Sequence, residues 1–454
     1  MIKRFISRLL GSTARAPRKS RLQRIPASEH GLPRERISPC ALKVTETLQQ
    51  HGHAAFIVGG AVRDLLLDKT PKDFDVVTDA TPEQIRALFR RAHIIGRRFR
   101  LVHVLCGNET VEVSTFRASA AGEQGEGAHV TDDTGRIVRD NVFGTQESDA
   151  ERRDFTVNAL YYDPGKEEIW DYRGGVQDIR NKVLRIIGDA GTRYREDPVR
   201  MLRAARFAAK LDFHIDETAR APMPELAELL ANVPPSRLFD EMLKLMLSGH
   251  ALRAVHQLRA EGLHYGVLPM LDKLLGDETG SRFLTAALHN TDLRIQAGKP
   301  VSPAFLFAAL LWHEVLERQR AHLDAGENEM PALFAAMEEV LDKQREVLAI
   351  PRRLDGTIKE IWSLQPRFSQ RTGGRAWRLL AHPRFRAGYD FLLLRAESGE
   401  AAQDLADWWT QFQSADDALR ANLIAGLAPA AAPRRRRRRK PSANRPVESP
   451  PAHD

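Results

Sequence analysis

The hydrophobic pattern of the chain changes character once, close to Pro198. Before it, helical stretches alternate with short apolar runs at residues 54–58, 102–105, 110–116 and 157–162. Such runs are typical of strands, whereas the later chain repeats its apolar residues at the helical spacing of three and four. Because 454 residues are too many for one hydrophobic core, the pattern predicts an α+β segment followed by an all-α segment.

Local signals place the elements and the boundaries of these segments. We expect a helix at residues 41–51, a strand at 54–58, a helix at 63–67 and a strand at 72–77. We divide the chain into a basic N-terminal arm at 1–40, a mixed head at 41–190, a helical neck at 191–255, an all-helical body at 256–425 and an Arg-rich tail at 426–454. Both termini are expected to be disordered.

The positive charge of the chain is concentrated at its two ends. Residues 1–36 hold ten Lys and Arg against two Glu, and the whole chain has a net charge of +8. The tail carries an unbroken basic run, formed by Arg434, Arg435, Arg436, Arg437, Arg438, Arg439 and Lys440. Clustered arginines release counterions when they meet a nucleic acid backbone, so this run predicts a sequence-independent contact with RNA phosphates. The alternative is a solvated tail that only improves solubility.

No membrane-spanning segment is expected, because charged residues interrupt every apolar run before the roughly 20 residues that a bilayer requires. The N-terminal arm has one apolar helical face, which includes Ile2, Phe5 and Leu9. Peripheral membrane association through this face is the alternative to a disordered arm.

The two cysteines, Cys40 and Cys106, have neither the spacing of a metal-binding motif nor the number needed for a disulfide framework. Free thiols are typical of a reducing compartment. We therefore expect a cytoplasmic protein, and we expect it to be a monomer.

Two aspartates in the predicted strand at 72–77 form the first candidate site. Side chains of a strand alternate between its faces, so Asp73 and Asp75 are expected on the same side, about 7 Å apart along the backbone. Two such carboxylates can share divalent cations, and Mg²⁺ suits carboxylate oxygens. An Asp-x-Asp pair alone is common on exposed strands, so its meaning depends on its surroundings.

Two nearby features strengthen this interpretation. Gly59 and Gly60 stand between a predicted strand and a predicted helix, where backbone N–H groups can approach phosphate oxygens and Arg63 adds positive charge. A tight strand-to-helix turn is the alternative. Glu112 lies between two valines in the predicted strand at 110–116. It is either a metal ligand, a general base or a solvated side chain.

Four segments between about residues 54 and 210 carry a recognisable combination of motifs. They are Phe56-Ile57-Val58-Gly59-Gly60-Ala61-Val62-Arg63-Asp64, Asp73-Phe74-Asp75, Arg152-Arg153-Asp154-Phe155-Thr156-Val157-Asn158-Ala159-Leu160 and Arg195-Glu196-Asp197-Pro198-Val199-Arg200-Met201-Leu202-Arg203-Ala204-Ala205-Arg206-Phe207. Together they resemble the nucleotidyltransferase superfamily that contains DNA polymerase β, and within it the bacterial poly(A) polymerase and CCA-adding enzyme family. The resemblance implies a polymerase-β-like head on a mixed sheet, followed by a helical neck and body that bind nucleotide and RNA.

The resemblance also implies roles for the matching residues. Asp73 and Asp75 are implied to bind two Mg²⁺ ions, and they are grouped with Asp154 and Glu112 as catalytic candidates. The substrate ATP is implied to contact Gly59, Gly60, Arg63, Arg153, Asn158, Asp197, Arg200, Arg203 and Arg206. Asp197 and Arg200 suit the edge of the base, because Asp accepts and Arg donates hydrogen bonds in fixed geometry. The spacing of Arg200, Arg203 and Arg206 also fits an ordinary basic helix face.

Three features favour a poly(A) polymerase over a CCA-adding enzyme. Residues 94–104, which include Arg97 and Arg98 as candidates for RNA phosphates, resemble a stretch of the bacterial poly(A) polymerases. Residues 350–353 and 389–396 resemble the same subgroup. The basic tail suits many unrelated RNA 3′ ends, whereas a tRNA enzyme depends more on shape. The expected activity is template-independent transfer of AMP from ATP to RNA 3′ ends, which promotes mRNA decay in bacteria.

Two alternatives stay open. A CCA-adding enzyme would use both CTP and ATP on tRNA ends. A non-catalytic RNA-binding scaffold is disfavoured because all the expected carboxylates are present. The sequence also leaves open which RNAs are tailed, and whether an RNA-degradation complex or an RNA chaperone recruits the protein.

Overall fold

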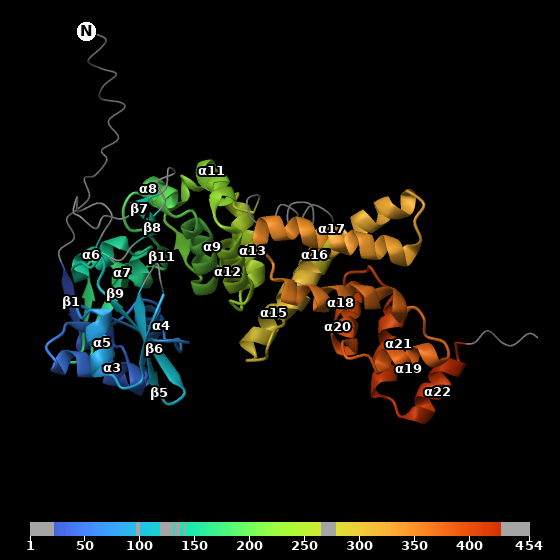
Figure 1. The fold of residues 1–454 in the computed structure, drawn as a ribbon, viewed down its shortest axis with the longest axis horizontal. Helices are drawn as coiled ribbons and strands as arrows, with labels where there is room; N and C mark the ends of the chain where they lie inside the picture. The colour runs from blue at the N-terminus through green and yellow to red at the C-terminus, as the bar shows by residue number, and fades with distance from the viewer. Residues whose placement is uncertain are drawn as a thin grey trace, which may run out of the picture. The chain divides into compact units, whose positions relative to one another are not determined.

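The computed structural model describes residues 22–96, 100–118, 130–131, 137–139, 142–264 and 278–427. The chain divides into two compact units between residues 359 and 360, within helix α18 (Asp355–Phe368). The first unit contains a mixed sheet followed by helices, and the second unit is helical (Figure 1). The predicted order of an α+β segment and an all-α segment is therefore confirmed.

An eight-stranded sheet forms the centre of the head. Its strand order is β1-β10-β9-β2-β3-β6-β5-β4, and all neighbours are antiparallel except the parallel pair β3 and β6. The strands are β1 (Gln23–Pro26), β2 (Ala55–Val58), β3 (Asp75–Thr78), β4 (Ala92–Ile95), β5 (Leu101–Cys106), β6 (Glu109–Thr115), β9 (Leu160–Asp163) and β10 (Glu168–Asp171). Two smaller ladders pair β7 (Val130–Thr131) with β8 (Ile137–Arg139) and β11 (Val183–Leu184) with β12 (His214–Ile215).

Helices α3 (Pro39–Gln50) and α5 (Pro82–Leu88) pack against each other and against the sheet (Figure 1). Their starts follow from local chemistry. The Ser38 hydroxyl accepts hydrogen bonds from two N–H groups of the first turn of α3, and Thr81 forms a capping box with Gln84 at α5. The other head helices are α2 (Ala27–His30), α4 (Gly60–Leu66), α6 (Gln146–Arg152) and α7 (Gly175–Arg180).

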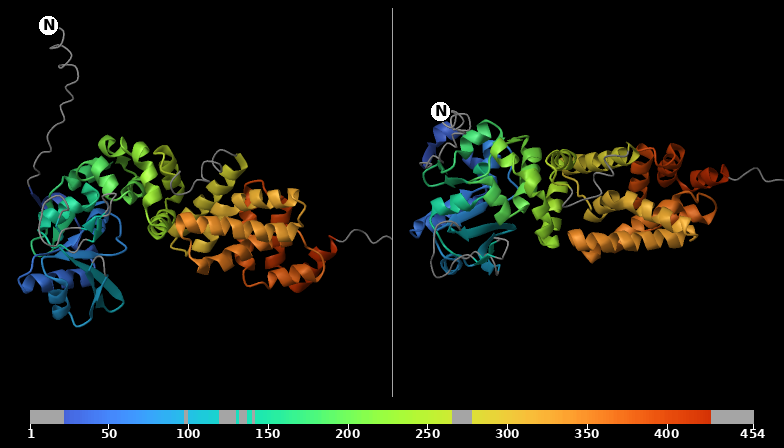
Figure 2. Two further views of the ribbon diagram at one scale, coloured as in Figure 1. Left: turned by 45° about the horizontal axis from the view of Figure 1, so that its top comes forward. Right: turned by 90° about the horizontal axis from the view of Figure 1, so that it is seen from above.

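The rest of the first unit is helical. Helices α9, α12 and α13 pack together and form the neck (Figure 2). The helices are α8 (Ala190–Glu196), α9 (Val199–Leu211), α10 (Glu217–Arg220), α11 (Met223–Leu226), α12 (Pro235–Met246), α13 (Ala251–Ala260), α15 (Glu278–Gln296), α16 (Pro303–Asp324) and α17 (Glu329–Leu348). No helix in the described part of the chain is both long and apolar enough to cross a membrane.

The helices of the second unit pack around an aromatic core. Trp409 and Phe412 on α21 pack with Phe368 and Phe385, and Trp409 donates a hydrogen bond to the Phe368 carbonyl at 2.9 Å. Such burial removes large apolar surfaces from water and stabilises the unit. Its further helices are α19 (Gly374–Leu380), α20 (Phe385–Glu397), α21 (Gln403–Ser414) and α22 (Asp417–Ala425).

Two segments differ from the sequence analysis. Residues 23–26, assigned to the N-terminal arm, form the edge strand β1, where Arg24 lies over the Trp170 ring at 4.4 Å. The strand expected at 72–77 begins at Asp75, so Asp73 precedes it. The reason is the partner strand: Val58 pairs with Asp75, and β2 leaves the sheet at Gly59 directly afterwards. The N-terminal apolar face and the basic tail lie outside the described residues.

The cysteines form a disulfide bond, which corrects the expectation of free thiols. Cys40 stands in the first turn of α3 and Cys106 ends β5, with their Cα atoms 5.9 Å apart. Helix α3 packs on β2, β3 and β6, and so brings two residues together that are 66 positions apart in the sequence. The bond therefore joins the helical layer of the head to the β5–β6 hairpin.

Candidate active site

Three carboxylates approach one another where β3 begins. Asp73 and Asp75 are exposed with the buried Phe74 between them, so the expected alternation extends beyond the end of the strand. In the parallel pair, Asp75 lies opposite Glu112. Part of the Asp75 side chain is exposed, but the surrounding protein still displaces water from its carboxyl. This loss of solvation, together with repulsion from Asp73 and Glu112, raises the pKa of the Asp75 carboxyl to about 6. The structure thus brings together the three candidates and concentrates negative charge between them.

These carboxylates fit a magnesium site that is completed by substrate. Within the described residues, no group of three or more His, Cys, Asp or Glu side chains is arranged to hold a metal ion alone. Mg²⁺ is commonly bound by one or two carboxylates together with phosphate oxygens and water. The repulsion on Asp75 is also what a divalent cation would relieve. The donor set of Asp73 and Asp75 therefore suits Mg²⁺ that arrives with a nucleotide.

The repulsion gives a prediction for the metal-free protein. The pKa of Asp75 is about 6 in the folded chain against an ordinary value of 3.8. Since the folded state binds this proton more tightly, ionisation of Asp75 destabilises the fold as the pH rises from about 4 through 6. In EDTA at about pH 7.5, Asp75→Asn is expected to melt about a degree above the wild type, since solvent screens this exposed carboxylate, with no difference near pH 4. Circular dichroism melting curves measure this, and a lower melting temperature at pH 7.5 would contradict it.

The glycine pair forms the turn between β2 and α4. Gly59 has φ 75° and ψ −126°, a conformation that strains any other residue. A Cβ atom at Gly59 would lie 3.4 Å from Nη1 of Arg153, and one at Gly60 would lie 3.5 Å from Nη2 of Arg63. Two guanidinium groups therefore flank the turn closely, which places positive charge where the sequence predicts a triphosphate.

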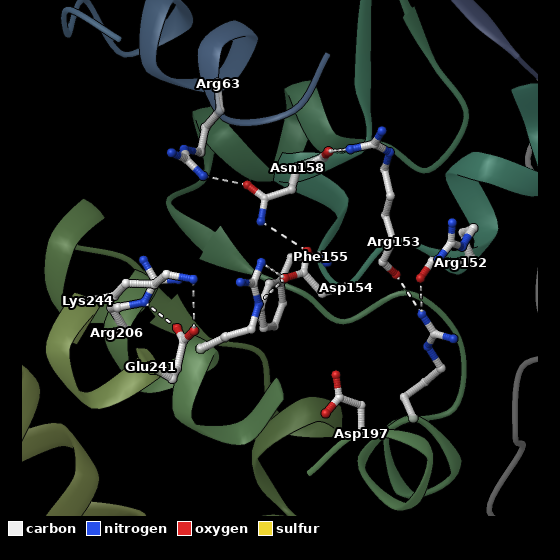
Figure 3. Close-up of polar contacts among 12 residues, drawn as sticks. Arg63, Arg152, Arg153, Asp154, Phe155, Asn158, Asp197, Arg206, Glu241 and Lys244 are labelled. Atoms are coloured by element: carbon white, nitrogen blue, oxygen red, sulfur yellow. Dashed lines mark hydrogen bonds and ion pairs between the residues drawn. The ribbon is translucent and has the colours of Figure 1, made fainter. Parts of the chain in front are cut away.

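Arg63 is held firmly beside this turn. It is 3% exposed and donates to Asp64 Oδ1 from Nε at 2.8 Å and from Nη2 at 2.6 Å. It also donates to the side-chain oxygen of Asn158 (Figure 3), and its guanidinium lies 5.1 Å from the centre of the Phe207 ring. These contacts engage three of the five N–H groups of Arg63, and its direct contact with the triphosphate stays a prediction.

Asp154 joins the head to the neck. Its Oδ1 accepts from Asn158 Nδ2 at 3.1 Å and from the Phe155 N–H at 2.8 Å, and its Oδ2 accepts from Arg203 at 2.8 and 2.6 Å. Burial alone would raise its pKa, but Arg203 and the hydrogen bonds to Asn158 and Phe155 hold it at about 2. A carboxylate this acidic is a poor proton acceptor at neutral pH. The geometry therefore favours a positioning role for Asp154 over general-base catalysis.

The three neck arginines do not form an exposed basic face. Arg200 donates to Glu196 at 2.9 Å and to the Arg193 carbonyl at 2.7 Å, while Arg203 pairs with Asp154. Arg206 donates to the buried Glu241 on α12 at 2.7 Å (Figure 3). Each guanidinium thus has an acidic partner, which excludes the interpretation as a solvated basic face.

Asp197 presents a free acceptor in the same region. Its Oδ2 accepts from Arg237 Nη2 at 3.0 Å. Its Oδ1 is buried and has no hydrogen-bond partner among the residues that the structure describes. Buried polar atoms are rarely left without a hydrogen bond, so this unpaired acceptor indicates a position where a ligand can donate one. This is the place where the sequence predicts the edge of the incoming base.

Comparison with known proteins decides the family. Three family models match: the poly A polymerase head domain at residues 55–185, the probable RNA and SrmB-binding site of polymerase A at 212–275, and the polymerase A arginine-rich C-terminus at 325–442. Poly(A) polymerase I of Salmonella typhimurium is 45% identical over 444 residues, which are 96% of this chain and 96% of that protein. The chain belongs to the poly(A) polymerase family.

Similarity to CCA-adding enzymes is more limited. The CCA-adding enzyme of Lactobacillus helveticus is 36% identical over 215 residues, 47% of this chain and 51% of that protein. A crystal structure of the Bacillus stearothermophilus CCA-adding enzyme in complex with CTP has a TM-score of 0.55 and 26% identity, and covers 86% of this chain and 84% of its own. The family membership thus agrees with the resemblance noted in the sequence, and the fold is shared with both groups.

Several residues of this poly(A) polymerase family site had no sequence signal of their own. Arg193 donates to the carbonyls of Arg152 and Arg153 at 2.6 and 2.8 Å, and so ties α8 to the head. The sequence analysis also gave no role to the hydrogen-bonding partners of the predicted residues, namely Asp149, Tyr161, Glu196, Arg237 and Glu241. Arg97, Arg98 and the run from Arg434 to Lys440 lie outside the described residues.

Proposed function

We propose that the chain is a polynucleotide adenylyltransferase that adds AMP from ATP to RNA 3′ ends without a template. The observation that carries this proposal is the extent of similarity. Poly(A) polymerase I of Salmonella typhimurium matches 96% of the chain, whereas the CCA-adding enzyme of Lactobacillus helveticus matches 47%. A family model named for polymerase A also matches residues 325–442, far from the catalytic head.

The proposed reaction is a single displacement at phosphorus. The RNA 3′-oxygen attacks the α-phosphorus of ATP, a phosphodiester bond forms, and the bond to pyrophosphate breaks. Asp73 and Asp75 hold Mg²⁺, which when bound lowers the pKa of the 3′-hydroxyl and stabilises the leaving pyrophosphate. Arg153, beside the Gly59 turn, donates hydrogen bonds to the triphosphate. Glu112 is the third carboxylate and either binds metal or accepts the proton of the 3′-hydroxyl.

Asp197 selects the base in this proposal. An unpaired carboxylate oxygen suits a base edge that carries an amino group, which adenine presents at N6 and cytosine at N4. Arg237 supports this role because it occupies the other oxygen and fixes the carboxylate. The same acceptor suits CTP, so a CCA-adding enzyme is the second candidate function.

RNA is the proposed second substrate. The match of residues 212–275 to a probable RNA-binding site supports contact with RNA in the neck. Arg97, Arg98 and the run from Arg434 to Lys440 supply phosphate contacts in this proposal, because arginine binds phosphates without regard to sequence. We propose that the enzyme acts on many RNA 3′ ends, that tailing promotes their decay, and that an RNA-degradation complex or an RNA chaperone recruits it. A cytoplasmic location is proposed from this RNA substrate and not from the cysteines, which form a disulfide.

One assay tests the proposed activity against its alternatives. The purified full chain is incubated with Mg²⁺ and each nucleoside triphosphate singly, on a generic RNA oligomer and on a tRNA that lacks its terminal CCA. Long tails from ATP alone on both RNAs are the expected result. Addition restricted to two C residues and one A on the tRNA would identify a CCA-adding enzyme. Intact RNA binding with no addition would identify a scaffold.

A further inference from the structure

Arg153 lies where the glycine turn and the acidic cluster meet. Its Nη1 is 3.4 Å from the position of a Cβ at Gly59 and donates to the Asn158 carbonyl at 3.4 Å (Figure 3). Its positive charge also acts on Asp75 and opposes the rise in the pKa of that carboxyl. The guanidinium is therefore near both the predicted phosphate turn and a predicted metal ligand.

Two residues outside the predicted site hold this guanidinium. Asp149 on α6 accepts a hydrogen bond from Arg153 Nε at 3.1 Å, and the same carboxylate oxygen forms an ion pair with Nη2 at 3.1 Å. Tyr161 on β9 shares the Nε proton at 3.1 Å and donates from its own hydroxyl to Asp149 at 2.8 Å. The three side chains thus form a closed triangle of hydrogen bonds.

The triangle is rigid because its two supporting corners are buried. Asp149 is 5% exposed, and Tyr161 is fully buried within an aromatic cluster that includes Phe56 and Tyr172. Burial raises the pKa of the Tyr161 hydroxyl well above its ordinary value, so it remains a neutral donor to Asp149 at all working pH values. The Asp149 charge in turn compensates the partly buried Arg153.

We propose that Asp149 and Tyr161 are positioning residues for the triphosphate, because they direct Arg153 toward the phosphates at the Gly59 turn. An arginine has many rotamers, and fixing it before the ligand arrives removes that entropic cost from binding. Asp149 and Tyr161 hold Nε and one edge of the guanidinium, and one Nη1 N–H is donated to the Asn158 carbonyl. The other N–H groups are left for phosphate oxygens. The inference rests on the proposed function, since it takes Arg153 as a triphosphate ligand.

The test uses Tyr161→Phe, which removes one hydroxyl and leaves the ring in its core. The dissociation constant for ATP, measured by calorimetry without RNA, is expected to rise about 5-fold, the usual effect of one lost hydrogen bond. The KM for ATP is expected to rise equally, with kcat within about 2-fold. Asp149→Asn, which loses a charged partner, is expected to raise both constants about 10-fold or more. Tyr162→Phe, on the neighbouring position of β9, is the control and is expected to leave both unchanged.

A double variant shows whether Tyr161 acts through Arg153. In an Arg153→Ala background, Tyr161→Phe is expected to change ATP affinity by less than about 2-fold, because the group that it positions is gone. An equal effect in both backgrounds, or none in the wild type, would overturn the proposal. If the wild type binds ATP but adds no AMP, the proposed function fails while ATP affinity still decides the positioning role. If the wild type does not bind ATP, both fail.

Discussion

Asp73→Ala and Asp75→Ala are each expected to lower the kcat of AMP addition by about 1,000-fold or more, while RNA binding is retained. The reason is electrostatic. The two carboxylates are the proposed ligands for the metal that would stabilise the leaving pyrophosphate, and losing one is expected to remove roughly 4 kcal/mol from the stabilisation of the transition state. Neither side chain supports the core, because both are exposed on either side of the buried Phe74. The two substitutions are therefore expected to lower kcat and to leave the stability of the fold nearly unchanged.

The measurement is single-turnover extension of a labelled RNA oligomer at saturating ATP and Mg²⁺. Asp79→Asn is a matched control, since Asp79 follows the other end of β3 and accepts a hydrogen bond from the Ala54 N–H at 3.0 Å, which the amide oxygen can keep. It is expected to retain near wild-type kcat. Filter binding of RNA checks that each variant still recognises its substrate. An Asp73 or Asp75 variant with more than about a tenth of wild-type kcat would refute the two-metal assignment.

The parts of the fold that depend on local signals were predictable. The apolar run at residues 54–58, stopped by Gly59 and Gly60, became β2 and the turn into α4. Elements that form only by pairing with a segment far away in the sequence could not be predicted. Strand β1 exists because β10 offers an edge more than 140 residues later, where Arg24 pairs with Trp170. The disulfide between Cys40 and Cys106 has the same origin, since only the packing of α3 on the sheet brings the two cysteines together.

The candidate site also combines residues that the local sequence predicts with partners that only the fold brings near. Motif residues such as Arg153 and Asp154 were found because they stand in one continuous segment that resembles a known family. Their partners come from other segments. Arg203 donates to Asp154 from 49 positions further along the sequence, and Arg237 donates to Asp197 from 40 positions further along. A single Arg or Asp on a helix carries no sign of what it faces, and a solvated basic face is the ordinary interpretation. Only the three-dimensional packing shows that the neck arginines are paired.

Arg203→Met is expected to lower the free energy of unfolding by about 3–5 kcal/mol at neutral pH, the usual cost of leaving a buried charge without its partner. The Arg203 guanidinium lies over the Phe207 ring at 5.3 Å, and methionine, an unbranched side chain whose sulfur also contacts aromatic rings favourably, fills this position with little change in packing. What remains is Asp154, whose side chain is 11% exposed and keeps only the hydrogen bonds from Asn158 and Phe155. Urea unfolding followed by circular dichroism measures the difference, with the exposed Arg375→Ala as a control that is expected to have no effect.

The pH dependence separates this charge effect from a general loss of packing. The pKa of Asp154 is about 2 in the folded wild type against an ordinary 3.8, so its pairing stabilises the protein above pH 3.8 and that stability is lost as the pH falls toward 2. The difference between wild type and Arg203→Met should therefore be largest at neutral pH and shrink below about pH 4. Asp154→Asn combined with Arg203→Met removes both charges, and we expect it to be more stable than Arg203→Met alone. A double variant as unstable as the single one would mean that Arg203 stabilises the junction of head and neck through its shape, and that the buried ion pair contributes little.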